Sequence, residues 1–349
     1  MDFKRCRAPF CAALFVLLLA ACSQAESSRA EFVLGTVCSV TLFDQAKDRI
    51  YQDIFNRIRE IENRMSVNIP VSDVSRINAA AGIEPVQVHD ETFKVIERAL
   101  HFAEQSGGAF DPTVEPLVSL WGVPGSNDRL QLNVRVPSQT EIDAVLPLIN
   151  WRNVELDHHT RSVFLRRRGM ALDLGAIAKG YAADEAAAII RSAGVKRAII
   201  DLGGNIFTVG VKKNKSPWRV GIQHPLEERG FTIGMVQTTE QTVVTSGVYE
   251  RFFEADSVKY HHIFSPSRGY PVNNGLLSVT VICSVSMDAD ALSTAAFVMG
   301  YARGRALVES FPGAEAVFVF EDLSVWKTLG VNFTLTDKSF RLARETSLH

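Results

Sequence analysis

Several short motifs that identify common enzyme classes are missing from this sequence. It has no Walker A run and no Gly-x-Gly-x-x-Gly fingerprint for a nucleotide, and no Gly-x-Ser-x-Gly elbow for a serine nucleophile. Its cysteines and histidines do not have the spacing of a zinc site. Any chemistry must therefore come from residues that lie far apart in the chain.

Strong net charge and long apolar runs are also lacking. The 349 residues are 46% hydrophobic and 22% charged, with a formal net charge of −2. This balance is ordinary for a globular protein and gives no electrostatic argument for binding nucleic acid. After residue 22 the sequence has no apolar run long enough for a transmembrane helix, no internal repeat and no low-complexity linker. We therefore expect one domain, at 31–349.

The N-terminus carries the one pronounced apolar segment. Basic residues at 4–7 precede an apolar stretch at 9–20, as in a secretory signal. The stretch ends in Leu-Ala-Ala-Cys, which is similar to a bacterial lipobox that would place a lipid on Cys22. The alternative is an ordinary secretory signal in which Cys22 is incidental. We predict a lipoprotein signal peptide at 1–21, a lipidated tether at 22–30 and a periplasmic protein anchored to the inner membrane by its lipid.

Only two cysteines follow this segment, Cys38 and Cys283, and each lies in an apolar run typical of a strand. They could pair as a disulfide in an oxidising compartment. The apolar surroundings favour two small buried core residues instead. Without residues 1–21, which hold three bases and one acid, the net charge is −4.

Hydrophobic periodicity divides the chain into strands and helices in a mixed order. The predicted strands are 31–43, a hairpin at 154–168, 198–206, 218–222, 232–236, 242–245, 278–283, 316–320, 325–329 and 332–335. The predicted helices are 50–65, 72–78, 92–105, 140–148, an Ala-rich segment ending near 192, 287–300 and 303–311. Strands outnumber helices and the two do not alternate strictly, which predicts an α+β fold rather than a doubly wound sheet.

The segment best suited to a ligand runs from Asp173 to Asp184. An acid and a glycine precede an Ala-rich helix, so N–H groups without intrahelical partners could face an anion. Gly175 would let a ligand approach the backbone closely, and Lys179 could reach a phosphate oxygen. The alternative is a capped helix with a solvated lysine.

Two other places suggest chemistry. Asp290 and Thr294 are four residues apart, so they share one face of a helix. A carboxylate, a hydroxyl and a backbone carbonyl from elsewhere would suit Mg²⁺, although acids here could also cap the helix N-terminus. His262 is the best general-base candidate, but a histidine beside a Pro- and Gly-containing loop is often a structural hydrogen-bonding residue.

Eight short motifs, taken together, resemble the ApbE family of FAD:protein FMN transferases over nearly all of residues 31–335. They are Leu34-Gly35-Thr36; Met65-Ser66 with Ser72 and Asn78; Ser106-Gly107-Gly108-Ala109-Phe110-Asp111-Pro112-Thr113; Asp173-Leu174-Gly175-Ala176-Ile177-Ala178-Lys179-Gly180; Gly203-Gly204-Asn205-Ile206; Thr245-Ser246-Gly247; His262-Ile263; and Asp290-Ala291-Leu292-Ser293-Thr294. The resemblance implies a T-fold-like α+β domain of mixed, mainly antiparallel sheets with packed helices.

The resemblance also implies an activity and a set of site residues. The enzyme would use Mg²⁺ to split the FAD pyrophosphate, release AMP and attach FMN by a phosphoester to Thr or Ser of a partner, such as flavin-acceptor subunits of Rnf- and Nqr-type redox complexes. The metal would take the Ala176 carbonyl, Asp290 and Thr294, and His262 would deprotonate the acceptor hydroxyl. The residues implied for the flavin nucleotide are Leu34, Asn68, Ala109, Phe110, Asp111, Asp173, Lys179 and Ile263.

Three positions depart from the family pattern. Asn68 stands where many relatives have Tyr, and Ser265 and Ser267 replace an Asp and a Thr in the loop after His262. Loss of the ring could leave room for water, so an Mg²⁺-dependent FAD pyrophosphatase that releases FMN and AMP is an alternative. A second alternative is a non-enzymatic FAD-binding lipoprotein.

Overall fold

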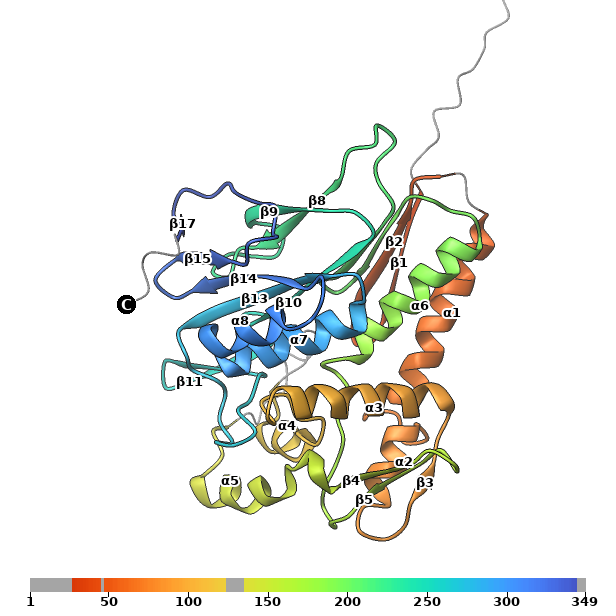
Figure 1. Cartoon of the computed structure of the whole chain (residues 1–349). Coiled ribbons are helices and arrows are strands. Elements are labelled where there is room, and N and C mark those ends of the chain that lie inside the picture. The colour runs from red at the N-terminus through yellow and green to blue at the C-terminus, as the bar shows by residue number, and fades with distance from the viewer. Residues whose placement is uncertain (1–26, 45–46, 124–134, 344–349) are drawn as a thin grey trace, which may run out of the picture.

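The computed structural model describes residues 27–44, 47–123 and 135–343 (Figure 1). It has an α+β fold with mainly antiparallel sheets, which confirms the predicted fold class. The predicted signal peptide at 1–21, the lipidation site Cys22 and most of the tether at 22–30 lie outside the described residues. Within the described ranges, no helix is both long and apolar enough to cross a membrane.

A nine-stranded sheet organises the fold, in the order β1-β2-β6-β7-β10-β13-β14-β15-β17. Its strands are β1 (Ser27–Val33), β2 (Thr36–Leu42), β6 (Ala198–Leu202), β7 (Asn205–Val209), β10 (Gln241–Gly247), β13 (Leu276–Cys283), β14 (Glu315–Phe320), β15 (Ser324–Lys327) and β17 (Arg341–Leu342). All neighbours are antiparallel except β15 and β17. All eight residues of β13 are buried, because both faces of the sheet are covered there.

Alternating side chains of the central strands serve two cores. Val279 and Val281 face the larger core, whereas Ile282 belongs to a second core. The larger core lies under a layer of four helices: α1 (Asp48–Met65), α6 (Ala178–Ser192), α7 (Ser286–Met299) and α8 (Tyr301–Glu309). The second core lies under a three-stranded sheet of β8 (Trp218–Gln223), β9 (Thr232–Thr238) and β16 (Phe333–Leu335).

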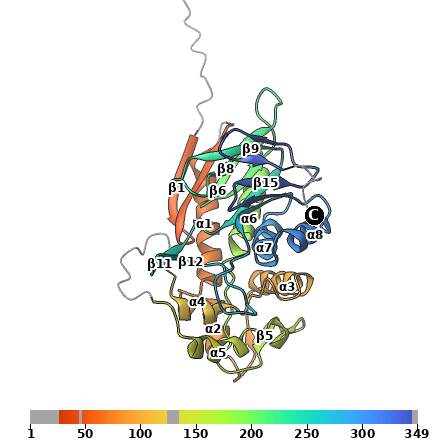
Figure 2. The ribbon, with the colours of Figure 1, turned by 90° about the vertical axis from the view of Figure 1, so that its left-hand side faces the viewer.

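The remaining elements gather beyond one end of these layers, below the large sheet in both ribbon views (Figures 1 and 2). They are α2 (Asp73–Ala79), α3 (Asp90–Gln105), α4 (Glu115–Trp121), α5 (Gln139–Val145), the one-turn helices at Leu146–Leu148 and Trp151–Asn153, and the sheet of β3 (Val86–Gln87), β5 (Ser162–Leu165) and β4 (Val154–Asp157). A separate hairpin joins β11 (Phe252–Ala255) to β12 (Val258–His261). A third core around Trp121 joins α4 and α5 to this hairpin.

Glycine turns divide two of the predicted strands, where Gly35 and the pair Gly203-Gly204 interrupt their sequences. The strand predicted at 31–43 becomes β1 and β2, which turn at Leu34 and Gly35 with φ of 55° and 67°. The strand predicted at 198–206 becomes β6 and β7, which turn at Gly203 and Gly204. The buried thiols of Cys38 and Cys283 are both free, which confirms the prediction of core residues, and burial raises the pKa of each to about 12.

Three details of the fold differ from the sequence-based expectation. The sequence analysis missed α4, which is only seven residues long and follows a loop motif that dominates the local pattern. It also missed the β11–β12 hairpin, whose strands are only four residues long. The strand predicted at 332–335 follows two strands of the large sheet in the chain, but it forms β16 and pairs with β9 instead. Strand partners depend on tertiary packing, and short segments carry little periodicity.

Close contact between α6 and α7 depends on Gly180. A Cβ at Gly180 would lie 2.2 Å from the backbone oxygen of Ser286, so only glycine lets the helices approach this far. The Asp184 carboxylate then accepts hydrogen bonds from the N–H groups of Ser286 and Met287, at 2.8 and 2.9 Å. An acid of one helix thus caps the N-terminus of the next, where an anion is stabilising.

We expect Gly180→Ala to lower the free energy of unfolding by about 3 kcal/mol, because backbone atoms of α7 must move to admit the methyl group. Chemical denaturation measures the change. Ser192→Ala, at the exposed end of the same helix, should change stability by less than about 0.5 kcal/mol. Equal stabilities for the Gly180 variant and the parent would show that the helices do not meet as described.

Candidate active site

One cavity of about 910 Å³ brings together every predicted catalytic, flavin and metal residue. It lies between the large sheet and the helices below it, where the β1–β2 turn, the β6–β7 turn and the end of β10 meet α4, the start of α6 and one face of α7. The predicted residues that line it are Leu34, Asn68, Ala109, Phe110, Asp111, Asp173, Ala176, Lys179, His262, Ile263, Asp290 and Thr294.

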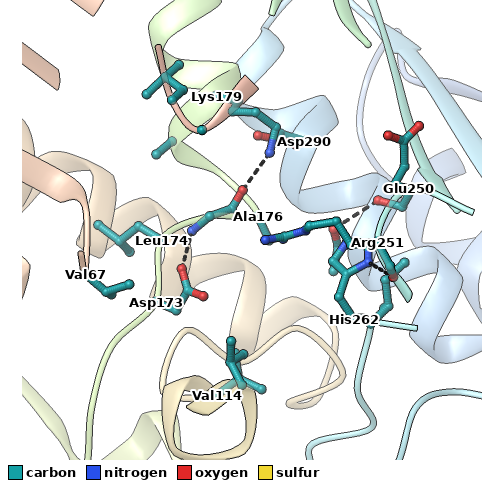
Figure 3. A pocket seen from close by; sticks show the side chains of 18 of the residues that line it. Val67, Val114, Asp173, Leu174, Ala176, Lys179, Glu250, Arg251, His262 and Asp290 are labelled. Atoms are coloured by element: carbon teal, nitrogen blue, oxygen red, sulfur yellow. Dashed lines mark hydrogen bonds between the residues drawn. The ribbon is translucent and has the colours of Figure 1, made fainter. Parts of the chain in front are cut away.

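Asp290 places a buried carboxylate on one wall of the cavity (Figure 3). The residue is 4% exposed, and its Oδ2 accepts a hydrogen bond from the Gly180 N–H at 2.9 Å. Its Oδ1 has no hydrogen-bond partner among the residues that the structure describes. Burial raises the pKa of Asp290, while the Lys179 charge and the Gly180 N–H act in the opposite direction. A positive ligand at Oδ1 would therefore stabilise the ionised form.

The other predicted metal-binding groups share this wall. Thr294 lies one turn after Asp290 on α7, and its hydroxyl is 3.1 Å from the Ser246 hydroxyl, which is 2.8 Å from that of Ser293. Ala176 belongs to the turn before α6 and lines the same cavity. Figure 3 shows Ala176 and Asp290 near one another, although they come from different elements.

These groups fit a magnesium ion better than a softer metal. A carboxylate, a hydroxyl and a carbonyl are hard oxygen ligands, and they include no thiolate or imidazole. Across the described parts of the chain, no three His, Cys, Asp or Glu side chains cluster as a metal site. With one carboxylate, the site suits an ion that takes its other ligands from water and phosphate, as Mg²⁺ commonly does.

In the turn from Asp173 to Lys179, the two end side chains form hydrogen bonds with backbone groups of the turn itself. Asp173 Oδ1 accepts from the Gly175 N–H at 2.7 Å, and the Asp173 N–H donates to the Pro112 carbonyl at 2.8 Å. Lys179 Nζ donates to the Gly175 carbonyl at 2.9 Å, which holds the ammonium beside the cavity. The sequence suggested an external anion at this helix start, but the Gly180 N–H already has Asp290 as its anionic partner. A ligand phosphate would therefore meet Lys179 rather than that amide.

The two adjacent histidines have different roles. His261 uses both ring nitrogens in the fold, with Nε2 2.8 Å from the Val272 carbonyl and Nδ1 accepting from the Ile263 N–H. His262 lines the cavity, and its Nδ1 is 3.2 Å from the Arg251 carbonyl. Since a carbonyl can only accept, Nδ1 must carry the proton, which leaves Nε2 as the basic nitrogen of the neutral ring.

The surroundings of His262 keep its imidazole neutral at pH 7. Desolvation is the main cause that lowers its pKa well below 6.5, and the positive charge of Arg251 and the neighbouring His261 add to the effect. A neutral imidazole with a free Nε2 can accept a proton from a hydroxyl group in the cavity. The side chain therefore meets the requirements of a general base.

Asp111 shapes the loop that precedes α4. One carboxylate oxygen accepts from the Thr113 N–H and hydroxyl, at 2.9 and 2.7 Å, and the other accepts from the Trp151 N–H at 3.1 Å. Phe110, which is almost fully buried, donates its N–H to the Ser106 hydroxyl. Asp111 thus lines the cavity as predicted, but its hydrogen bonds hold the loop that presents Ala109 and Phe110.

The positions that depart from the family pattern lie at the edge of the cavity or beside it. Asn68 is an exposed lining residue whose backbone N–H donates to the Ser66 hydroxyl. The Ser265 and Ser267 hydroxyls lie 3.2 Å apart within the turn after His262, so they hold that turn together.

Glu115 is a lining residue that the sequence analysis did not identify. It starts α4, where an acid usually serves the helix N-terminus. Its Oε1 accepts from the Ser119 hydroxyl at 2.6 Å, while its Oε2 is buried and has no partner within the described structure. Burial raises the pKa of this carboxyl group to about 7; the Ser119 hydrogen bond opposes this shift, and the negative charge of Asp173 adds to it. Near neutral pH the group can donate a hydrogen bond to a ligand.

Charged groups near the β6–β7 turn were missed as well. Arg229 pairs with Glu250 at 3.1 Å and reaches the Gly203 carbonyl, and Arg251 follows directly in the chain. No local motif marks these residues, because they reach the cavity from the β8–β9 loop and from the segment before β11.

We expect Glu115→Gln to change how stability depends on pH. From about pH 4.5 to about pH 7 the unfolded chain loses this proton, while the folded protein keeps it. The parent therefore loses stability as pH rises through this range, and the loss levels off above pH 7. The Gln variant lacks this contribution. The difference in melting temperature, variant minus parent, should therefore increase by about 2–4 °C from pH 5 to pH 7.5.

Melting curves recorded across this pH range test the assignment. The exposed Glu104→Gln should follow the parent at every pH. A constant difference between Glu115→Gln and the parent at all pH values would mean that this carboxyl group does not titrate near neutrality.

Comparison with known proteins identifies the family of this chain. The model of the ApbE family matches residues 34–318. The chain is 38% identical to an FAD:protein FMN transferase of Treponema pallidum strain Nichols over 323 residues, which is 88% of each chain. It is 39% identical over 274 residues to an FAD:protein FMN transferase of Klebsiella pneumoniae strain 342, covering 78% of this chain and 82% of the relative.

Two solved structures have the same fold. The ApbE protein of Thermotoga maritima matches with a TM-score of 0.78 and 37% identity, over 86% of this chain and 96% of that one. The flavin transferase ApbE of Vibrio cholerae matches with a TM-score of 0.75 and 28% identity, over 90% and 98%. The chain therefore belongs to the ApbE family.

Proposed function

We propose that this protein is an FAD:protein FMN transferase. One observation carries the proposal. The cavity combines the Asp290 carboxylate, the Thr294 hydroxyl and the Ala176 carbonyl with the neutral imidazole of His262, whose Nε2 has no partner among the described residues. Relatives of this chain bear the same name as the proposed activity. A volume of about 910 Å³ is near the upper end of the usual range for small-molecule sites, which suits a dinucleotide such as FAD.

In the proposed reaction a Thr or Ser hydroxyl of the acceptor attacks the phosphorus of the FMN half of FAD. A new phosphoester bond forms, the bond to the bridging pyrophosphate oxygen breaks, and AMP leaves. His262 Nε2 accepts the hydroxyl proton. The chain's contribution to this phosphoryl transfer is mainly to position the groups and to offset negative charge.

In this proposal the pyrophosphate lies against the wall of the cavity that carries Lys179 and Asp290. Lys179 presents an ammonium group to it. Asp290 Oδ1, the Thr294 hydroxyl and the Ala176 carbonyl would hold Mg²⁺, which when bound supplies positive charge next to the phosphate oxygens. Leu34, Phe110 and Ile263 supply apolar surface for the flavin nucleotide. Further lining residues in this proposal are Asn68, Ala109, Asp111 and Asp173.

Asn68 favours a second candidate activity. A short, exposed amide stands at the edge of the cavity where a larger ring would fill space. Water could then take the place of the acceptor hydroxyl, and the enzyme would release FMN and AMP as an Mg²⁺-dependent FAD pyrophosphatase. Both activities use the same cavity and the same metal, and they differ only in the nucleophile.

The proposal also includes the subcellular location of the enzyme. The Leu-Ala-Ala-Cys pattern supports a periplasmic enzyme held at the inner membrane by a lipid on Cys22. Acceptors in that compartment would be flavin-carrying subunits of Rnf- and Nqr-type redox complexes, as the family resemblance implies.

Asp290→Asn should lower Mg²⁺-dependent release of AMP from FAD at least about 100-fold, because the amide cannot supply the negative charge. The fold should remain, since an amide oxygen can still accept from the Gly180 N–H. AMP release with and without Mg²⁺ is the measurement, and a melting curve checks the fold.

Asp288→Asn is the matched control on the same helix. Asp288 pairs with Arg98 at 2.7 Å and does not line the cavity, so its loss should leave the response to Mg²⁺ unchanged. If Asp290→Asn kept full Mg²⁺-dependent turnover, the metal assignment would be wrong.

His262→Gln should lower the transfer of flavin to an acceptor subunit by about 10²–10⁴-fold. Since the pKa of His262 lies well below 6.5, activity of the parent should fall only at pH values below 6.5, and this acidic limb should vanish in the variant. Covalent flavin fluorescence on a co-expressed Rnf- or Nqr-type subunit in a denaturing gel measures transfer.

Release of AMP with and without that subunit separates the two activities. A transferase requires the acceptor for turnover and labels it, whereas AMP release that ignores the acceptor, with no labelled subunit, identifies a pyrophosphatase. His158→Gln, which changes an exposed histidine outside the cavity, should behave like the parent.

A further inference from the structure

The two ends of the large sheet differ in what they carry. Register places Ser27 opposite Leu42, Leu42 opposite Ala198, and Ala198 opposite Val209, so all four residues mark one end of neighbouring strands. The turn at Leu34 and the turn at residues 203–204 lie at the other end and line the cavity. A seven-residue strand is about 20 Å long, so the first described residue and the cavity are separated by about that distance.

The end that holds Ser27 has a surface rich in lysine. The loop after β7 contributes Lys212, Lys213 and Lys215, and the segments before β6 and α1 contribute Lys196 and Lys47. We call these five residues the lysine surface. All are exposed except Lys212, which is half-buried, and none forms an ion pair with the residues that the structure describes. Figures 1 and 2 show the start of β1 and the loop before β8 at the same end of the molecule.

Acidic residues do not neutralise this surface. The acids that lie among these segments are each paired with an arginine: Asp44 with Arg197, Asp48 with Arg29, and Glu240 with Arg191. The lysines are therefore a local excess of positive charge on a chain whose net charge, without residues 1–21, is −4. Such an excess attracts an anionic surface.

We propose that the lysine surface lies against anionic phospholipid headgroups and holds the cavity on the side of the domain away from the bilayer. The orientation rests on the proposed lipid at Cys22, because Ser27 follows Cys22 by only five residues. Fully extended, they span at most about 18 Å, so the anchored chain would keep this end of the sheet near the headgroups. An acceptor would then have to present its hydroxyl about 20 Å or more from the bilayer surface.

Vesicle binding by the exported protein, as cells process it, tests the lipid contact. Each lysine near an anionic surface contributes about a fivefold gain in binding, and this gain falls with salt. The readout is the ratio of partition into phosphatidylglycerol-containing vesicles to partition into phosphatidylcholine vesicles. A variant with Lys212, Lys213 and Lys215 changed to Ser should lower this ratio by up to about 100-fold. Any N-terminal lipid contributes equally to both partitions and cancels in the ratio.

The matched control changes Lys94, Lys259 and Lys338 to Ser, three exposed lysines outside the lysine surface. The proposal predicts a ratio close to that of the parent. It is overturned if the control lowers the ratio as much as the first variant, or if neither variant changes it. Failure to bind phosphatidylcholine vesicles at all would argue against the lipid anchor, and partition into phosphatidylglycerol-containing vesicles alone, compared between the two variants, would then test the lysine surface.

A headgroup-attached quencher tests the orientation. The buried Cys38 and Cys283 should resist labelling, so a fluorophore can be placed on Asn214→Cys within the lysine-rich loop or on the exposed Arg268→Cys near the cavity. On anionic vesicles the probe at 214 should be quenched and the probe at 268 should not. Equal quenching at both positions would overturn the orientation, whereas loss of flavin transfer in the separate enzyme assay would overturn only the proposed activity.

Discussion

The hydrogen bond between the Gly180 N–H and Asp290 Oδ2 is the contact on which the rest of the site depends. It joins α6 to α7 at the point where a side chain on residue 180 would overlap the backbone of Ser286. Asp184 fixes the same pair of helices one turn further along by capping α7. Because of this joint, the turn that carries Ala176 and the helix face that carries Thr294 line one cavity.

The joint also explains how a carboxylate is tolerated in a buried position. An ionised carboxylate away from water is costly unless hydrogen bonds or opposite charge compensate it. Asp290 has one backbone N–H and a nearby lysine, which is partial compensation, so its pKa is raised. The second carboxylate oxygen has no hydrogen-bond partner among the described residues. A cation at that oxygen would favour the ionised form and would thereby add stability to the folded protein.

The same division between structural and chemical polar groups recurs around the cavity. His261 uses both ring nitrogens in hydrogen bonds to neighbouring backbone groups. His262 follows it, with Nδ1 bonded to the Arg251 carbonyl and Nε2 without a partner among the described residues. Both carboxylate oxygens of Asp111 accept hydrogen bonds from nearby loop residues, whereas one carboxylate oxygen of Glu115 has no partner within the described structure. In each pair the first residue is fully hydrogen-bonded within the fold, and the second keeps a polar atom without a partner among the described residues. Rigid surroundings of this kind are what positioning catalysis requires.

The sequence by itself determined the α+β class, most of the helices, the two glycine turns and twelve of the residues that line the cavity. These follow from periodicity, from glycine at positive φ and from eight motifs whose residues match one family. It did not determine that β16 pairs with β9, that Asp290 rather than a ligand faces the start of α6, or that Glu115 has a buried oxygen without a partner. Only the tertiary structure decided these points, because strand partners, burial and the pKa of a carboxyl group depend on residues that are distant in the chain and meet only after folding.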